Sequence, residues 1–191
     1  MSQRDEAGVV AAVGIPGGLR SGVSDAQNVG VVRAGDEFIF LTTTLYAVWA
    51  MAFVPRPSGE IVLEADRSGI GDADELSSEL LRLGLWARFH EDLETDRGTL
   101  ERLRLHLVSM GLGEEEAGRF RLGNAQMQTY LELDIASYAL VLMSNSSASL
   151  WDLCEQASSH LDESADTVAI RMLPIIPKLV QSGAAVLDLA R

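Results

Sequence analysis

Residues 80–89 read LLRLGLWARF, and residues 178–187 read KLVQSGAAVL. In each stretch an apolar helical pattern runs into a glycine, Gly84 or Gly183, and a second apolar run follows at once. A glycine in this place is typical of the residue just after a helix, where a left-handed backbone closes the last turn. Both stretches therefore predict a helix that ends and turns directly into a strand.

The similarity between the two halves of the chain extends upstream. Residues 35–51 read GDEFIFLTTTLYAVWAM, and residues 123–143 read GNAQMQTYLELDIASYALVLM. Each contains a Gly-Asx pair, a strand-like run, a polar residue and an apolar helix. The polar residue, Thr42 or Asp134, can accept a hydrogen bond from the first turn of the helix that follows it. Two amphipathic segments can match by chance, but three anchors that recur in the same order predict an internal duplication.

Each copy predicts one strand followed by three helices and a closing strand. The expected elements of the second copy are a strand over 127–133 and helices that begin at Ile135, Ser149 and Asp166; the expected helices of the first copy span 43–53, 60–66 and 72–83. Pro174 predicts a kink or a new turn inside the last helix. Apolar spacing predicts one buried face for the helix over 135–143, formed by Ile135, Ala139, Leu142 and Met143.

This order of elements is the winged-helix plan. The sequence therefore predicts a mainly α chain with small β-sheets (α+β), organised as two tandem winged-helix-like domains. We expect the first domain over residues 31–90 and the second over 120–191. Residues 1–30 are expected to form a partly flexible N-terminal segment, and residues 91–119 a linker with a helix over 99–110.

The composition limits the classes of partner. The 191 residues carry a formal net charge of −13 at pH 7, which repels nucleic acid and anionic membranes because both need their phosphate charge neutralised. Cys154 is the only cysteine, which is typical of a reducing compartment. The sequence has no signal-peptide pattern, and its longest apolar run is too short to span a bilayer. We expect a soluble cytoplasmic protein with no membrane partner.

No arrangement typical of catalysis or of metal binding occurs in the sequence. His90, His106 and His160 are scattered, whereas metal ligands usually come in close pairs. Residues 15–18, IPGG, lack the spacing and the lysine of a phosphate-binding loop and predict a flexible turn. We therefore expect no enzyme activity, no cofactor and no metal. A cluster of arginines is interleaved with acidic residues and predicts a solvated face of ion pairs in preference to a phosphate site, namely Arg97, Arg102, Arg104, Arg119 and Arg121.

The second copy resembles a known family. Its run YLELDIASYALVLM, followed by SLWDLCEQ and KLVQSGAAVL, is similar to the PqqD-like winged-helix domains, which recognise the leader segments of ribosomally made, modified peptides. The resemblance covers about residues 119–189 and rests on Leu133, Asp134, Leu150 and Gly183. It implies that a peptide adds as a strand to the sheet edge and lies in a groove beside the third helix. The residues implied to bind the peptide are Met127, Thr129, Leu131, Leu133, Thr167, Ile170, Arg171 and Lys178.

Two functions of different classes follow from these observations. The first is a non-enzymatic adaptor or accessory protein that binds a leader peptide or a partner protein in a biosynthetic or regulatory complex. The alternative is a DNA-binding transcriptional regulator. A winged helix that reads DNA needs basic residues on its third helix, but residues 71–84, GDADELSSELLRLG, carry several acids and a single arginine. We expect a peptide or protein partner, and the sequence leaves a homodimer open.

Overall fold

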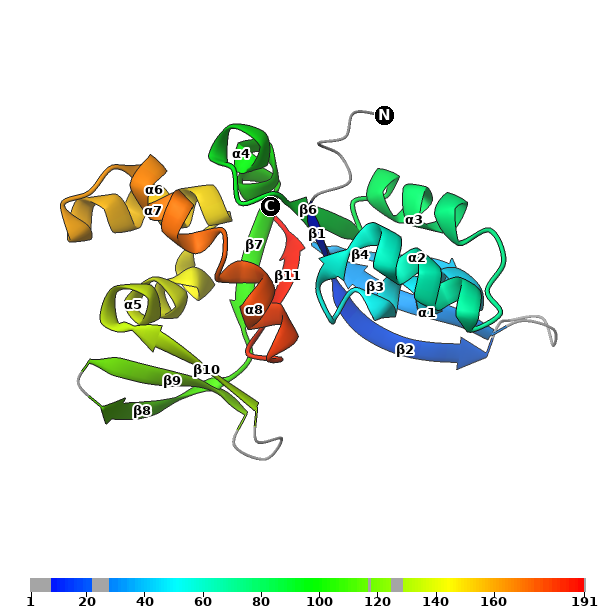
Figure 1. Ribbon diagram of the computed structural model, residues 1–191, viewed down its shortest axis with the longest axis horizontal. Coiled ribbons are helices and arrows are strands. Elements are labelled where there is room, and N and C mark those ends of the chain that lie inside the picture. Colours follow the sequence, from blue (N-terminus) through cyan, green and yellow to red (C-terminus); the bar gives the residue numbers. More distant parts are fainter. Residues whose placement is uncertain (1–7, 22–27, 117, 125–128, 191) are drawn as a thin grey trace. The chain divides into compact units, whose positions relative to one another are not determined.

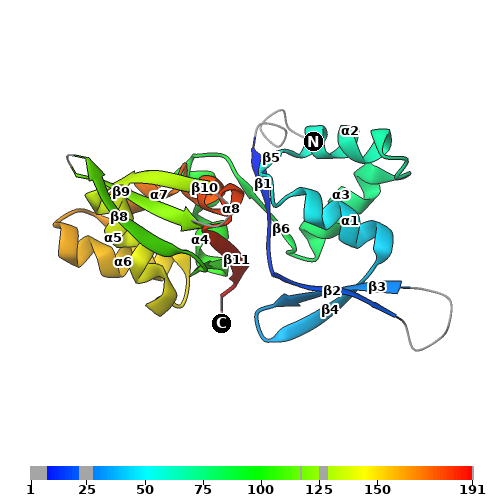
Figure 2. The ribbon, with the colours of Figure 1, turned by 90° about the horizontal axis from the view of Figure 1, so that it is seen from below.

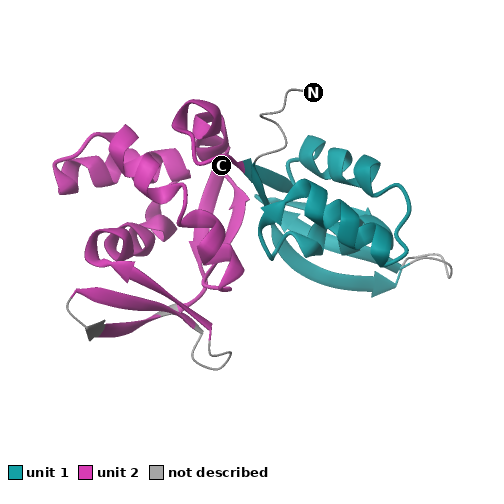
Figure 3. Cartoon of the chain, in the orientation of Figure 1, with its two compact units in different colours: residues 1–88 teal, residues 89–191 magenta. Residues whose placement is uncertain are grey.

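The computed structural model describes residues 8–21, 28–116, 118–124 and 129–190. The chain forms two compact units, residues 1–88 and residues 89–191 (Figure 3). Each unit combines helices with small sheets, as the ribbon in Figure 1 shows. The α+β class predicted from the sequence is therefore confirmed.

The first unit is an antiparallel sheet followed by three helices. Its elements are β1 (Val9–Ala12), β2 (Ile15–Ser21), β3 (Asn28–Ala34), β4 (Glu37–Thr42), α1 (Thr43–Met51), β5 (Arg56–Pro57), α2 (Ser58–Arg67), α3 (Ala73–Arg82) and β6 (Trp86–Phe89). Strands β2, β3 and β4 pair in that order, and the helices lie on one side of this sheet in Figure 2. A second sheet has the order β5-β1-β6, so the closing strand lies beside the first.

Helix α1 begins and packs as its sequence dictates. The Thr42 side chain accepts a hydrogen bond from the Leu45 N–H at 3.2 Å, which satisfies one free donor of the first turn. The helix packs against β3 because Gly30 has no side chain, and a Cβ there would overlap the ring of Tyr46. Trp49 is fully buried in the resulting core.

The second unit has a similar order of elements, with one helix added in front and no counterpart of β5 among the described residues. Its elements are α4 (Leu93–Arg102), β7 (Leu103–Leu107), β8 (Met110–Glu116), β9 (Arg119–Asn124), β10 (Thr129–Asp134), α5 (Ile135–Met143), a 3₁₀ turn (Ser144–Ser146), α6 (Leu150–Leu161), α7 (Ala165–Met172), α8 (Ile176–Gln181) and β11 (Ala185–Leu189). Strands β8, β9 and β10 form an antiparallel sheet, and α5 lies against β9 and β10 (Figure 1). The closing strand β11 pairs antiparallel with β7.

The two stretches quoted first adopt one conformation. Gly84 and Gly183 have φ angles of +69° and +68°. In both places the glycine N–H donates to the carbonyl three residues earlier, at 3.1 and 3.0 Å, and the next N–H donates to the carbonyl five residues earlier, at 3.0 Å. The order of strands and helices from β1 to β6 resembles that from β7 to β11, except that β5 has no counterpart in the described part of the second unit and α7 and α8 stand where the first unit has α3. The same glycine turn therefore precedes the closing strand of each unit.

Two stretches of the chain differ from their sequence-based expectation. The helix expected over 99–110 ends at Arg102, and residues 103–107 form strand β7. The sequence LRLHL alternates between apolar and polar residues, as a strand does. It forms a strand and not a helix because Leu103 to Leu107 pair with β11. The loop expected at residues 15–18 lies in β2, where a bulge between Pro16 and Gly18 accommodates the Pro-Gly-Gly run.

The prediction of which face of α5 is buried is wrong. Ile135 and Leu142 are 65% and 47% exposed, whereas Ser137, Leu140 and Val141 are buried. The helix is apolar on nearly all sides, so spacing alone does not single out its core face. The break predicted in the last helix is confirmed: α7 ends at Met172, two residues before Pro174, and α8 begins at Ile176.

Asp134 caps α5, and its charge links the cap to pH. Its Oδ1 accepts the Ser137 N–H at 2.8 Å. This hydrogen bond lowers the pKa of the Asp134 carboxyl below its ordinary value of 3.8. The folded state therefore binds the proton less readily than the unfolded chain does. The charged cap stabilises the fold fully above pH 3.8, and this stabilisation is lost as the pH falls through the lowered pKa.

Replacing Asp134 with alanine is expected to reduce the free energy of unfolding by about 0.5–2 kcal/mol at neutral pH. The deficit should shrink as the pH falls below 3.8, because the parent then loses the charged cap as well. Thr42→Ala is the matched control at the equivalent cap, which has no titrating group. Urea unfolding across acidic pH checks this, and an equally pH-independent deficit in both variants would contradict it.

Candidate peptide-binding groove

A pocket of about 620 Å³ opens between strand β10 and helix α8 in the second unit. Three of its lining residues come from the strand and three from the end of the helix: Thr129, Tyr130, Leu131, Lys178, Gln181 and Ser182. We call this pocket, with these six residues, the β10–α8 groove.

Local sequence explains why both walls are available. Among the described residues, β10 pairs only with β9, so its other edge carries no partner strand. On α8 the residues Ile176, Leu179 and Val180 are buried. Their spacing turns Lys178 and Gln181 outward, and both side chains are exposed.

The two faces of β10 have different chemistry. Leu133 is 6% exposed and belongs to the core on the helix-covered face, which Thr129 and Leu131 share by alternation. On the opposite face, the Arg121 guanidinium lies 4.3 Å from the centre of the Tyr130 ring. Arg121 also lies 3.5 Å from a Glu132 carboxylate oxygen. The outer face thus carries internal polar contacts, and the groove is lined by Thr129 and Leu131 of the inner face together with Tyr130.

The structure brings together part of the residue set implied by the family resemblance. Thr129, Leu131 and Lys178 line one groove. Leu133 is adjacent in sequence but buried, so its side chain supports the fold and does not face a ligand. Met127 lies outside the described residues.

Three further residues of that set lie on α7 and do not line the groove. Thr167 donates its N–H to the Ser164 cap, and Ile170 is 58% exposed. The Arg171 guanidinium lies 2.7 Å from a Glu163 carboxylate oxygen. The break at residues 173–175 separates this helix from α8, which is why a single continuous helix face does not form.

Sequence reasoning missed three lining residues, Tyr130, Gln181 and Ser182. Gln181 could have been predicted from the sequence, because it follows Lys178 by three positions and so lies on the same helix face. Tyr130 could not have been predicted in this way, because strand alternation places its side chain on the opposite face from Thr129 and Leu131.

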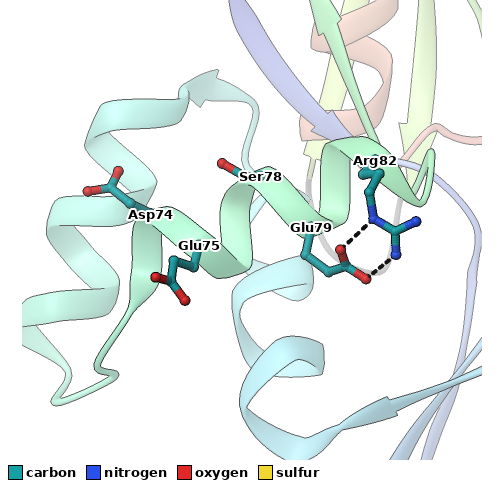
Figure 4. Close-up of a pocket in the computed structure, with 5 residues that line it drawn as sticks. All are labelled: Asp74, Glu75, Ser78, Glu79 and Arg82. Atoms are coloured by element: carbon teal, nitrogen blue, oxygen red, sulfur yellow. Dashed lines mark hydrogen bonds and ion pairs between the residues drawn. The ribbon is translucent and has the colours of Figure 1, made fainter.

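The corresponding helix of the first unit carries a second, smaller pocket of about 350 Å³ (Figure 4). Its lining side chains all come from α3, namely Asp74, Glu75, Ser78, Glu79 and Arg82. Arg82 makes two hydrogen bonds to Glu79, at 2.7 and 2.6 Å, and they lower the pKa of the Glu79 carboxyl. This surface is an acidic, solvated helix face whose one cation is already paired.

The structure shows the surroundings of the single cysteine, and it bears out the expected solvated face of ion pairs for only part of the arginine cluster, because Arg104 pairs with the fully buried Asp188. Burial raises the pKa of the Cys154 thiol to about 12, so it stays protonated and is a poor nucleophile. Four of the five clustered arginines form ion pairs: Arg97 with Glu101, Arg104 with Asp188, and Arg119 and Arg121 with Glu132. Arg102 donates instead to the Gly98 carbonyl.

Within residues 8–21, 28–116, 118–124 and 129–190, no three His, Cys, Asp or Glu side chains are placed to hold a metal ion. In the same part of the chain, every helix is too short or too polar to cross a membrane. Comparison of the chain with family models, with curated proteins and with solved structures gave no match. The groove must therefore be interpreted from its own chemistry.

Proposed function

We propose that this chain is a non-enzymatic adaptor that binds an extended segment of a partner peptide or protein. The segment adds as a strand to the open edge of β10 and places side chains in the β10–α8 groove. The observation that carries the proposal is the pocket of about 620 Å³ directly beside a strand edge that has no partner strand in the described part of the chain. Edge addition supplies backbone hydrogen bonds, and the adjoining pocket supplies side-chain selectivity.

The order of elements in each unit favours the winged-helix interpretation. Both units contain a strand, helices and a closing strand in this order; the short strand β5 follows the first helix of the first unit, and the last helix of the second unit is divided into α7 and α8. We take the two units to be tandem winged-helix-like domains, and the second to be the PqqD-like one. On this interpretation the groove lies where that family holds its peptide, between the edge strand and the third helix.

The surface chemistry disfavours the alternative of a DNA-binding regulator. On α3 the exposed face carries Asp74, Glu75 and Glu79, which repel phosphate. Arg171, on the equivalent part of the second unit, already pairs with Glu163. A groove that binds an uncharged backbone needs no basic surface, so an acidic chain can use it.

The test uses a displayed library of random dodecapeptides, selected on the intact chain. Gln181→Trp fills the groove with a large side chain from its exposed rim. We expect selected peptides to lose at least about 10-fold in affinity for this variant, because the pocket beside the strand edge is blocked. Affinity measured by titration calorimetry checks this.

Arg82→Trp is the matched control, because Arg82 lies two positions before Gly84 and Gln181 lies two positions before Gly183. It adds the same side chain at the equivalent position of the first unit and should leave peptide affinity unchanged. Two results would contradict the proposal. One is equal binding by the parent and Gln181→Trp. The other is tight, salt-sensitive binding to duplex DNA that is lost on replacing Arg171 and Lys178.

A further inference from the structure

Among the described residues of the second unit, two cations have no carboxylate within 4.0 Å, Arg102 and Lys178. Arg102 donates to the Gly98 carbonyl, and Lys178 is the one that lines the groove. Five arginines of this unit lie within 4.0 Å of a carboxylate: Arg97, Arg104, Arg119, Arg121 and Arg171. Lys178, the single lysine of the chain, has no carboxylate at that distance among the described residues. Its ammonium is therefore available to an incoming group.

A second group in the groove also lacks a partner. The Thr129 hydroxyl oxygen is buried and makes no hydrogen bond. An unsatisfied buried hydroxyl costs free energy, and rotation about its χ1 bond lets it donate to an acceptor placed in the pocket. A lone cation and a free hydroxyl donor thus line the same small space.

The equivalent helix face of the first unit differs in its charge pairing. The positions equivalent to Lys178 and Gln181, counted back from the shared glycine, are Glu79 and Arg82. These two side chains neutralise each other through a bidentate pair. In the second unit the same two positions hold a cation and a neutral amide, so the charge at Lys178 remains uncompensated.

We propose that the segment bound in the β10–α8 groove carries an aspartate or glutamate side chain that pairs with Lys178 and accepts a hydrogen bond from Thr129. This inference rests on the proposed function. A single cation matches a carboxylate, whereas a phosphate group would need more positive charge than this groove offers. Lys178 shares the groove with Thr129 and Leu131, which lie on the helix-covered face of β10, and a side chain that leaves the added strand can reach it there. A chain terminus would instead continue along the sheet edge.

The experiment repeats the dodecapeptide selection with the random region flanked by constant sequence, on the parent chain and on Lys178→Glu. We expect Asp or Glu to be enriched at one position on the parent, and Lys or Arg at that position on Lys178→Glu. Changing the acidic residue of a selected peptide to its amide should weaken binding to the parent about 10-fold or more. Arg20→Glu, an exposed residue of β2, is the control with the same charge change, and it should select the same peptides as the parent.

The outcomes separate this inference from the proposed function. Peptides that depend on the groove, as judged by Gln181→Trp, but show no acidic preference would overturn the carboxylate pairing alone. Binding that needs a free C-terminal carboxylate, tested with amidated peptides, would also overturn it. Selected peptides that bind Gln181→Trp as well as the parent would overturn both. Circular dichroism and thermal melting show whether Lys178→Glu is folded, and Lys178→Gln serves as a second variant, expected to lose the acidic preference without gaining a basic one.

Discussion

Trp49→Ala should lower the free energy of unfolding of the first unit by about 3–5 kcal/mol. The indole is fully buried, and its ring centre lies 5.2 Å from that of Tyr46 and 5.0 Å from that of Phe53. Its Nε1–H donates to the Val13 carbonyl at 3.0 Å. Alanine would leave a large cavity and an unsatisfied buried carbonyl, and both effects destabilise the same core.

Phe40→Thr provides the matched control for Trp49→Ala. Phe40 is also an aromatic residue of the first unit but is 68% exposed on β4. Threonine keeps the strand preference, so the expected change is below about 1 kcal/mol. Hydrogen exchange of amides within residues 28–88 reports the stability of this unit. Equal effects of the two substitutions would show that the core assignment is wrong.

Asp188→Ala should destabilise the second unit by about 3–5 kcal/mol, because it removes one partner of a buried ion pair. The Asp188 carboxylate is fully buried on β11 and accepts from Arg104 on β7 at 3.0 Å. The Arg104 side chain is only 12% exposed, so its charge would remain in the interior without its partner. Urea unfolding followed by tryptophan fluorescence measures the change.

Two further variants test the physical reason for this effect. Asp166→Ala removes an exposed carboxylate that lies 4.0 Å from Arg97, and it should cost less than about 1 kcal/mol. Arg104→Met combined with Asp188→Leu removes both buried charges and should recover much of the stability lost in Asp188→Ala. A double variant as unstable as the single one would mean that packing at this strand pair, and not the orphaned charge, sets the cost.

Local signals in the sequence were sufficient for several helix ends, although not for the helix expected over 99–110. Thr42 and Asp134 cap α1 and α5, and the two glycines end the last helices as predicted, because these features depend only on neighbouring residues. Long-range pairing was not accessible in the same way. Residues 103–107 fit a helical and a strand pattern equally, and only the pairing with β11 decides between them.

Part of the groove was expected from what the family resemblance implies. Thr129, Leu131 and Lys178 were expected at one site and line one pocket. The α7 residues Thr167 and Ile170 were expected there too, but the break before α8 removes them from it. A proline in the sequence predicts that a helix breaks there, but it does not predict the direction that the chain takes afterwards.

Strand addition at β10 is the central claim, and hydrogen exchange of its backbone amides tests it most directly. Alternate N–H groups of an edge strand point away from the sheet and exchange with solvent. With a selected peptide bound, we predict that exchange slows at alternate residues of Thr129–Asp134, while the edge strand Glu37–Thr42 of the first unit is unchanged. Unchanged exchange along β10 with the peptide bound, or slowing confined to the first unit, would contradict the account.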